Sequence, residues 1–159
     1  MATIKSAYCD GTKPMPTPSA QETITVYTEV SLTSAQVANG NVVQFFKLPP
    51  NCVPVGYAIN NDDLDTGGAA MTADFGILND AGTAISTAAA DGGDEWIDGS
   101  TVLTGAALTL HTASRAVYDV LKAVTPSATS ERIVALVFMS APTTPASGGI
   151  GVEFSYRAA

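Results

Sequence analysis

Basic residues are scarce in this sequence of 159 residues. Only 7 lysines and arginines stand against 15 aspartates and glutamates, which gives a formal net charge of −8. Proteins that bind nucleic acid use lysine and arginine to contact the phosphates, and anionic membrane surfaces attract the same side chains. The composition therefore predicts that neither nucleic acid nor a membrane is a partner of this protein.

Side chains for catalysis are equally few. His111 is the single histidine, so a metal centre with two or three histidine ligands is excluded. The sequence has no Gly-x-Ser-x-Gly motif for a serine nucleophile, and its glycine pairs fit turns rather than a phosphate-binding loop. Cys9 and Cys52 fit no metal-ligand spacing, and in a reducing compartment we expect both to be free. We predict a protein that is not an enzyme and has no cofactor and no metal.

Long apolar runs are also missing. No segment approaches the roughly 20 apolar residues that span a bilayer. The N-terminal residues Met1–Ser6 lack an apolar signal segment, so we expect the protein to be synthesised and retained in the cytoplasm.

Charge of either sign is low, and aromatic residues are few. Charged residues make up 14% of the chain, against an average of about 25%. Hydrophobic residues reach 46% but aromatic residues only 7%, and alanine supplies much of the difference. A neutral surface of small residues suits a protein that packs into an assembly. The alternative is a monomer with ordinary strands rich in alanine and threonine.

The chain is long enough for one domain that buries about 70% of the surface its unfolded form exposes. Its most informative stretch runs from residue 42 to 78. β-Branched and aromatic residues predict strands at Val42–Leu48 and Val53–Ile59, separated by Pro49 and Pro50, which cannot donate to a sheet. A turn rich in Asn, Asp and Gly follows at 60–68, and alternation from Met71 to Ile77 predicts a third strand.

Further strands follow from the same patterns. They are predicted at Gln21–Leu32, Val102–His111, Arg132–Met139 and Gly151–Arg157, with a short one at Thr3–Cys9. Residues 116–124 fit helix and strand periods equally, and the even spacing of turns favours a strand. About eight strands with little helix predict an all-β, antiparallel, jelly-roll-like β-sandwich, with residues 21–159 as its single domain.

Residues 1–20 differ from the rest because they hold Pro14, Pro16 and Pro18 after Lys13. Three residues with fixed φ among five favour an extended segment that cannot join the interior of a sheet. We predict an extended N-terminal arm that reaches a neighbouring molecule and adds little to the core. A plain linker is the alternative.

Acidic residues gather between residues 60 and 98, where the sequence has nine, and no lysine or arginine occurs from Leu48 to Ser114. Asn61, Asp63 and Asp65 have the spacing that begins a calcium loop, but the glycine comes at 67 and the closing glutamate is missing. This excludes a helix–loop–helix calcium site and leaves adventitious calcium binding at the turn as an alternative. Paired carboxylates for glycoside hydrolysis lack nearby aromatic platforms except Trp96, which we expect to insert into the core. Solvated turn acids that keep an apolar protein soluble are the favoured interpretation.

Several of these segments resemble a family of small tailed-bacteriophage capsid proteins. The resemblance rests on Lys47-Leu48-Pro49, the turn Asn61-Asp62-Asp63-Leu64-Asp65-Thr66-Gly67, the following strand with Asp74, and Trp96-Ile97-Asp98-Gly99-Ser100-Thr101. The likeness covers roughly Ile24 to Tyr156, and its motifs are short turn motifs. At Pro50-Asn51-Cys52 the chain departs from the family, which more often has a small basic turn there.

Members of that family resemble decoration, or cement, proteins, which stabilise phage heads. The resemblance implies a virion protein that binds the outside of the head, contacts the major capsid protein, and forms a homo-oligomer, a dimer or trimer. As contacts to the shell or to sister subunits we predict Lys13, Pro14, Pro16, Pro18, Asn61, Asp62, Asp63, Asp65 and Trp96. The rival hypothesis is a carbohydrate-binding or adhesin-like module of a head or tail fibre, which would need exposed aromatic side chains.

Overall fold

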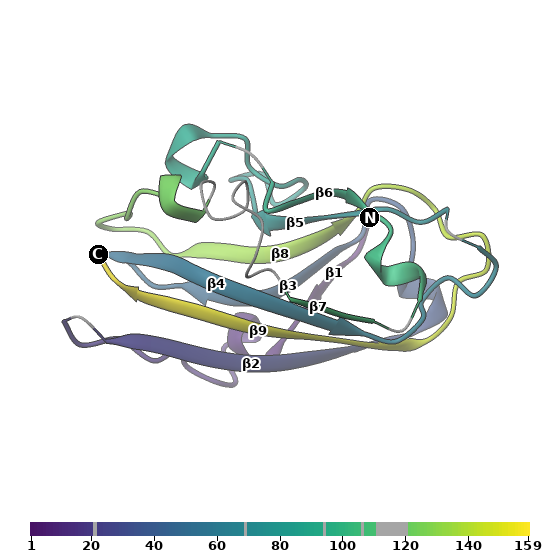
Figure 1. Cartoon of the computed structure of the whole chain (residues 1–159), viewed down its shortest axis with the longest axis horizontal. Helices are drawn as coiled ribbons and strands as arrows, with labels where there is room; N and C mark the ends of the chain where they lie inside the picture. Colours follow the sequence, from purple (N-terminus) through teal and green to yellow (C-terminus); the bar gives the residue numbers. More distant parts are fainter. Residues whose placement is uncertain (21, 69, 94, 106, 111–120) are drawn as a thin grey trace.

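The fold consists of two β-sheets packed face to face in a sandwich (Figure 1). The structure is a computed structural model that describes residues 1–20, 22–68, 70–93, 95–105, 107–110 and 121–159. His111 and the first residues of the ambiguous segment 116–124 lie outside the described residues. No helix in the described part of the chain is long and apolar enough to cross a membrane.

The first sheet has five strands in the order β1-β3-β8-β5-β6. Their bounds are β1 Thr3–Lys5, β3 Val42–Leu48, β8 Arg132–Phe138, β5 Ala73–Ile77 and β6 Ile97–Ser100. β1 runs parallel to β3, and every other pair is antiparallel. The apolar strand β8, which the sequence predicts as a strand, lies at the centre of this sheet.

The second sheet has four antiparallel strands in the order β2-β9-β4-β7. Their bounds are β2 Thr23–Leu32, β9 Gly148–Ala158, β4 Cys52–Asn61 and β7 Ala107–Leu110. The predicted alternation of β2 is confirmed, because Val26, Val30 and Leu32 are buried while Tyr27 and Glu29 between them are exposed. β2 therefore presents one apolar face to the core and one polar face to solvent.

In the residues that the structure describes, helix is limited to short pieces. These are α1 Ala7–Asp10 and three single turns, η1 Ser34–Gln36, η2 Ala89–Asp91 and η3 Val102–Thr104, together with a helical turn at 121–123. The preference for a strand at 116–124 is thus wrong for its described end. Leu121 and Val124 are both buried, and a spacing of three residues brings side chains to one face of a helical turn.

The prediction of an all-β, mainly antiparallel sandwich with little helix is confirmed, with nine strands in the described residues. Apart from β5 and β6, strands that are consecutive in the sequence lie in opposite sheets. The core between the sheets is rich in aromatic rings. A bulge between Gln44 and Phe46 lets both Phe45 and Phe46 face inward, and Phe46 stacks on Phe154 with ring centroids 5.4 Å apart.

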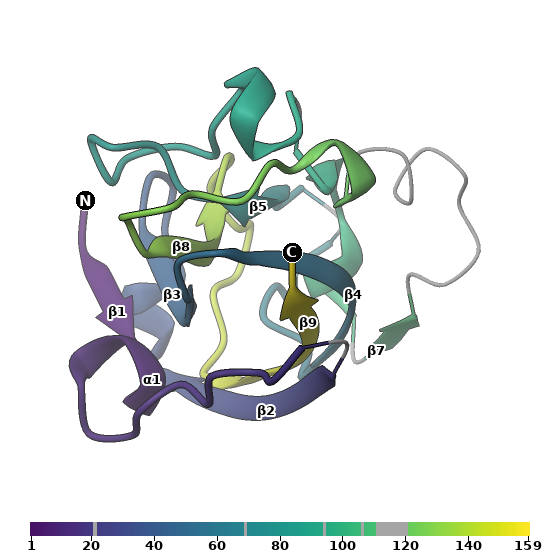
Figure 2. The ribbon, with the colours of Figure 1, turned by 90° about the vertical axis from the view of Figure 1, so that its left-hand side faces the viewer.

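The N-terminal residues are packed into this sandwich (Figure 2). β1 extends the first sheet by pairing with β3, and the amide of Ser6 donates to the Gln44 carbonyl at 2.9 Å. Tyr8 of α1 is only 4% exposed and lies 5.4 Å from the ring of Phe46. The expectation that residues 1–20 add little to the core is therefore wrong for residues 3–10, because β1 pairs with β3 and Tyr8 is buried in the core. The domain boundary at residue 20 stays a prediction.

Candidate functional site

The proline segment from Lys13 to Pro18 is held against the body of the protein. The amide of Lys13 donates to the Ala7 carbonyl at 2.8 Å. The hydroxyl of Tyr156, in β9, donates to the carbonyl of Pro16 at 2.5 Å, and Pro18 is buried. Pro14 and Pro16 remain exposed. This segment is thus a surface ridge, anchored to the rest of the protein by the Lys13 amide, the Pro16 carbonyl and the buried Pro18.

A hollow of about 290 Å³ lies between this ridge and the turn at Pro49 and Pro50. Two cations line it. The Lys13 ammonium lies 4.6 Å from the centre of the Tyr8 ring, a cation–π contact. The Lys47 ammonium lies 3.7 Å from a Glu131 carboxylate oxygen. Lys13 is thus exposed at the surface beside Pro14 and Pro16, which the sequence predicts as contacts together with it.

The acidic turn after β4 begins with a buried residue. The amide nitrogen of the Asn61 side chain donates to the carbonyls of Asp62 at 2.8 Å and Gly105 at 2.9 Å. The exposed Asp62 accepts the amide of Gly149 at 2.8 Å, and the half-buried Asp63 accepts the amide of Asp65 at 3.1 Å. Asn61 therefore holds the turn in place, while Asp62 and Asp63 present negative charge at its surface.

Asp65 joins two loops inside the protein. It is 1% exposed and accepts the amides of Thr144 at 2.8 Å and Met71 at 3.3 Å. These backbone donors, Thr144 first, lower the pKa of its carboxyl because they stabilise the ionised form. The interpretation of every turn acid as solvated is therefore wrong for Asp65. Its burial also removes it from the predicted surface contacts.

Trp96 likewise lies in the core, as its sequence context predicts. Its side chain is 2% exposed and stacks on Tyr57 and Phe154, with ring centroids 5.6 and 6.0 Å away. A buried indole cannot touch the shell or a sister subunit, so Trp96 is removed from the predicted contacts. The indole nitrogen has no hydrogen-bond partner among the described residues.

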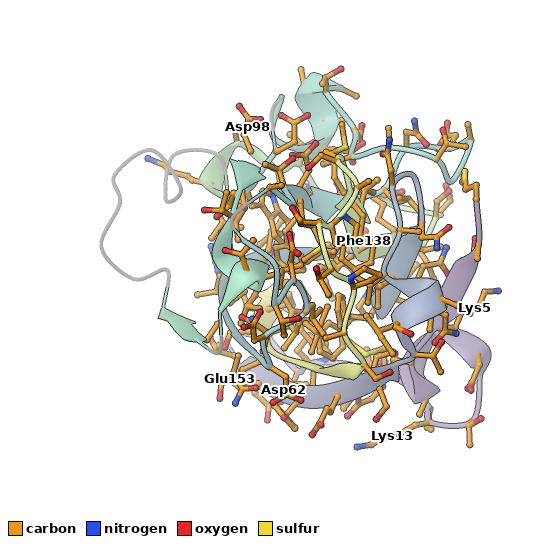
Figure 3. All side chains as sticks on the ribbon, turned by 90° about the vertical axis from the view of Figure 1, so that its right-hand side faces the viewer. Lys5, Lys13, Asp62, Asp98, Phe138 and Glu153 are labelled. Carbon is orange, nitrogen blue, oxygen red and sulfur yellow. The ribbon has the colours of Figure 1, made fainter. Side chains whose placement is uncertain are left out.

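Figure 3 shows the positions of five charged side chains. Lys5 and Lys13 project from the N-terminal segment on one side, and Asp62, Asp98 and Glu153 lie on the other. The predicted contacts therefore form two groups. Lys13, Pro14 and Pro16 lie on the N-terminal ridge, and Asp62 and Asp63 lie in the turn after β4.

Chemistry for catalysis or metal binding is sparse. Within the described ranges, no cluster of three or more His, Cys, Asp or Glu side chains could hold a metal ion. Cys9 and Cys52 are both free, as predicted, and both are buried. Burial raises the pKa of Cys9 to about 11, so at neutral pH this thiol is protonated and unreactive.

One polar interaction was missed by sequence reasoning. A guanidinium nitrogen of Arg132 lies 3.1 Å from a carboxylate oxygen of Asp91, with both side chains less than one-fifth exposed. The same nitrogen donates to the Ala90 carbonyl at 3.0 Å, and Ser86 donates to Asp91 at 2.7 Å. These bonds attach the η2 turn to β8. The residues are separated by about forty positions, so no local pattern could have revealed the pair.

No protein-family model and no curated protein matches the chain. Two solved structures are similar to it. The first is a chain in the capsid of Ralstonia phage GP4, with a TM-score of 0.78 and 25% sequence identity over 99% of this chain and 98% of that one. The second, a chain in the capsid asymmetric unit of cyanophage Pam1, has a TM-score of 0.57 and 17% identity over 92% and 94%, and supports the fold alone. The similarity to the GP4 capsid chain supports a phage capsid-related protein with a structural role in the virion.

Proposed function

We propose that this protein is a capsid decoration protein: it binds the outer surface of a phage head and stabilises the shell of major capsid protein. The observation that carries the proposal is the similarity to a chain of the GP4 capsid along 99% of the sequence. The protein would be made in the host cytoplasm and would act on the virion exterior as a homo-oligomer, a dimer or trimer.

The N-terminal ridge supports this role. Pro14 and Pro16 are exposed, and their φ angles are fixed by the pyrrolidine rings. The ridge is also anchored through Tyr156 and Pro18. A surface that is already rigid loses little conformational entropy when it docks, which favours binding to a shell. We propose Lys13, Pro14 and Pro16 as one contact, with the same residues available to a sister subunit.

The acidic turn after β4 supplies the second proposed contact, through Asp62 and Asp63. Asp62 and Asp63 carry charge at the surface, and the sequence has no lysine or arginine from residue 48 to 114. Such a region attracts a basic patch on the shell and speeds association at low ionic strength. Screening over about 8 Å at physiological salt reduces that effect.

The rival roles receive less support. A sugar-binding module needs exposed aromatic rings, yet Tyr8, Tyr57, Trp96 and Tyr156 are at most 5% exposed. Among the described tyrosines and Trp96, Tyr27 is the one that lies at the surface, at 51% exposure. We also propose that the protein has no catalytic activity, because its described residues bring no nucleophile and base together.

The test uses heads purified from a phage that lacks the gene. The purified protein is mixed with these heads, which are then sedimented and heated. We expect saturable binding at a fixed copy number and a higher temperature of head disruption than for bare heads. Heat-denatured protein serves as the control. Failure to co-sediment with heads at low and physiological salt would refute the proposal.

A further inference from the structure

A hollow of about 370 Å³ lies where the start of β4, the turn at 121–124 and the end of β9 meet. Figure 2 shows this turn and the C-terminal end of β9 on either side of β4. The hollow is separate from the proline ridge and from the acidic turn, and none of the residues predicted from the sequence as contacts lines it.

The hollow has a mainly apolar lining. Leu121 and Val124 are 4% and 3% exposed, so the turn that carries them is fixed to the core. Val55 is 44% exposed, which makes it one of the few large apolar side chains at the surface. The reason is local: the register of β4 against β9 shifts between Pro54 and Gly56, so Val55 is the extra residue of a bulge. Proline has no amide hydrogen to donate to the ladder, which favours a bulge beside it.

Two cations flank this apolar surface. Arg157 comes from β9, where it pairs across the sheet with Val53, and Lys122 comes from the helical turn. Both side chains are exposed, and neither makes an ion pair within the described part of the chain, whereas Lys47 and Arg132 do. Ala159 also lines the groove. In a chain of net charge −8, two cations that form no ion pair with a described side chain make the charge beside this apolar groove locally positive.

We infer that this groove binds an extended segment of a neighbouring capsid-shell subunit in which an apolar side chain adjoins a carboxylate. The inference rests on the proposed function and adds a third contact to it. The apolar side chain covers Val55 and removes it from water. The carboxylate lies between Arg157 and Lys122, and a guanidinium can hold it with two parallel hydrogen bonds. The charge decides the class of partner, because an apolar groove without the cations would not select an acidic segment.

The test measures the affinity of variants for heads that lack the protein. Lys122→Glu and Arg157→Glu reverse the two charges, and Val55→Asp makes the groove polar. Lys5→Glu is the matched control, since it reverses an exposed cation in β1, far from the groove. We expect each groove variant to bind at least tenfold more weakly and the control to stay within about twofold of the wild type.

The outcomes separate this inference from the proposed function. If the wild type binds heads and Lys122→Glu and Val55→Asp bind with unchanged affinity, the proposed contact through the groove is refuted while the proposed binding to heads stands. Absence of wild-type binding would refute both. Lys122 is exposed on a surface turn, so its variant reports on the groove even if the change in β9 disturbs folding. The wild type is also tested for binding to a 20-nucleotide DNA strand. If it binds the strand and Lys122→Glu abolishes that binding, the groove is a site for polyanions and the inference is refuted.

Discussion

Replacing Tyr8 by alanine tests whether the N-terminal residues belong to the folded core. Tyr8 is 4% exposed, and its ring centre lies 5.4 Å from that of Phe46. The Lys13 ammonium lies 4.6 Å from the centre of the same ring. Truncating a buried aromatic side chain to alanine costs about 3–5 kcal/mol, since burial is lost and a cavity remains. For a domain of this size, each kcal/mol lowers the melting temperature by about 2–4 °C. The expected fall is therefore about 6–20 °C.

The assay is thermal unfolding followed by circular dichroism, with urea unfolding as a second measurement. Tyr27→Ala is the matched control, because Tyr27 is 51% exposed and its removal should cost less than about 1 kcal/mol. Deleting residues 1–20 should destabilise at least as strongly as Tyr8→Ala. A Tyr8→Ala variant that melts within about 2 °C of the wild type would refute the reasoning, and residues 1–20 would then be the detached arm that the proline pattern predicts.

Three further predictions concern charged residues. Because backbone donors lower the pKa of Asp65, its contribution to stability is present above about pH 4 and is lost as the pH falls through the lowered pKa. The unfolding free energy of Asp65→Asn, measured by urea titration, should therefore fall less steeply with decreasing pH than that of the wild type. An equally steep fall in the variant would contradict the prediction. Arg132→Ala should cost about 1–3 kcal/mol of unfolding free energy, against less than about 1 kcal/mol for Lys47→Ala, whose ion pair is more exposed; equal losses would contradict the prediction. Neutralising Asp62 and Asp63 to asparagine should make the association rate with heads less sensitive to salt, and an unchanged salt dependence would assign both residues to solubility.

The strands could be predicted because their patterns are local. Val42–Leu48 coincides with β3, and the alternation of β2 gives its buried face correctly. Prolines at 49 and 50 end the first of these strands, since they lack an amide hydrogen. Trp96 could be placed in the core because Ile97 beside it is apolar while its other neighbours are polar. Period and turn chemistry are sufficient for conclusions of this kind.

The site was less predictable because its contacts are distant in sequence. The proline pattern indicated an extended segment at 14–18 but not its anchor, which is Tyr156 at a separation of 140 residues. Asp65 looked like any other turn acid, and only the folded loops bring the Thr144 amide to its carboxylate. The groove at Val55 depends on a bulge and on a turn from another part of the chain. Composition and spacing carry no signal for such contacts.

The position of β9 has a consequence for how the protein folds in the cell. This strand follows the other described strands in the sequence, yet it lies between β2 and β4 and pairs with both along most of its length. During synthesis β2 and β4 therefore emerge long before the strand that joins them, and the second sheet forms only after β9 has left the ribosome. Such long-range pairing slows folding, typically to milliseconds or seconds. Until then the apolar faces of β2 and β4 are open, and such exposed apolar surface makes incompletely folded chains prone to aggregate.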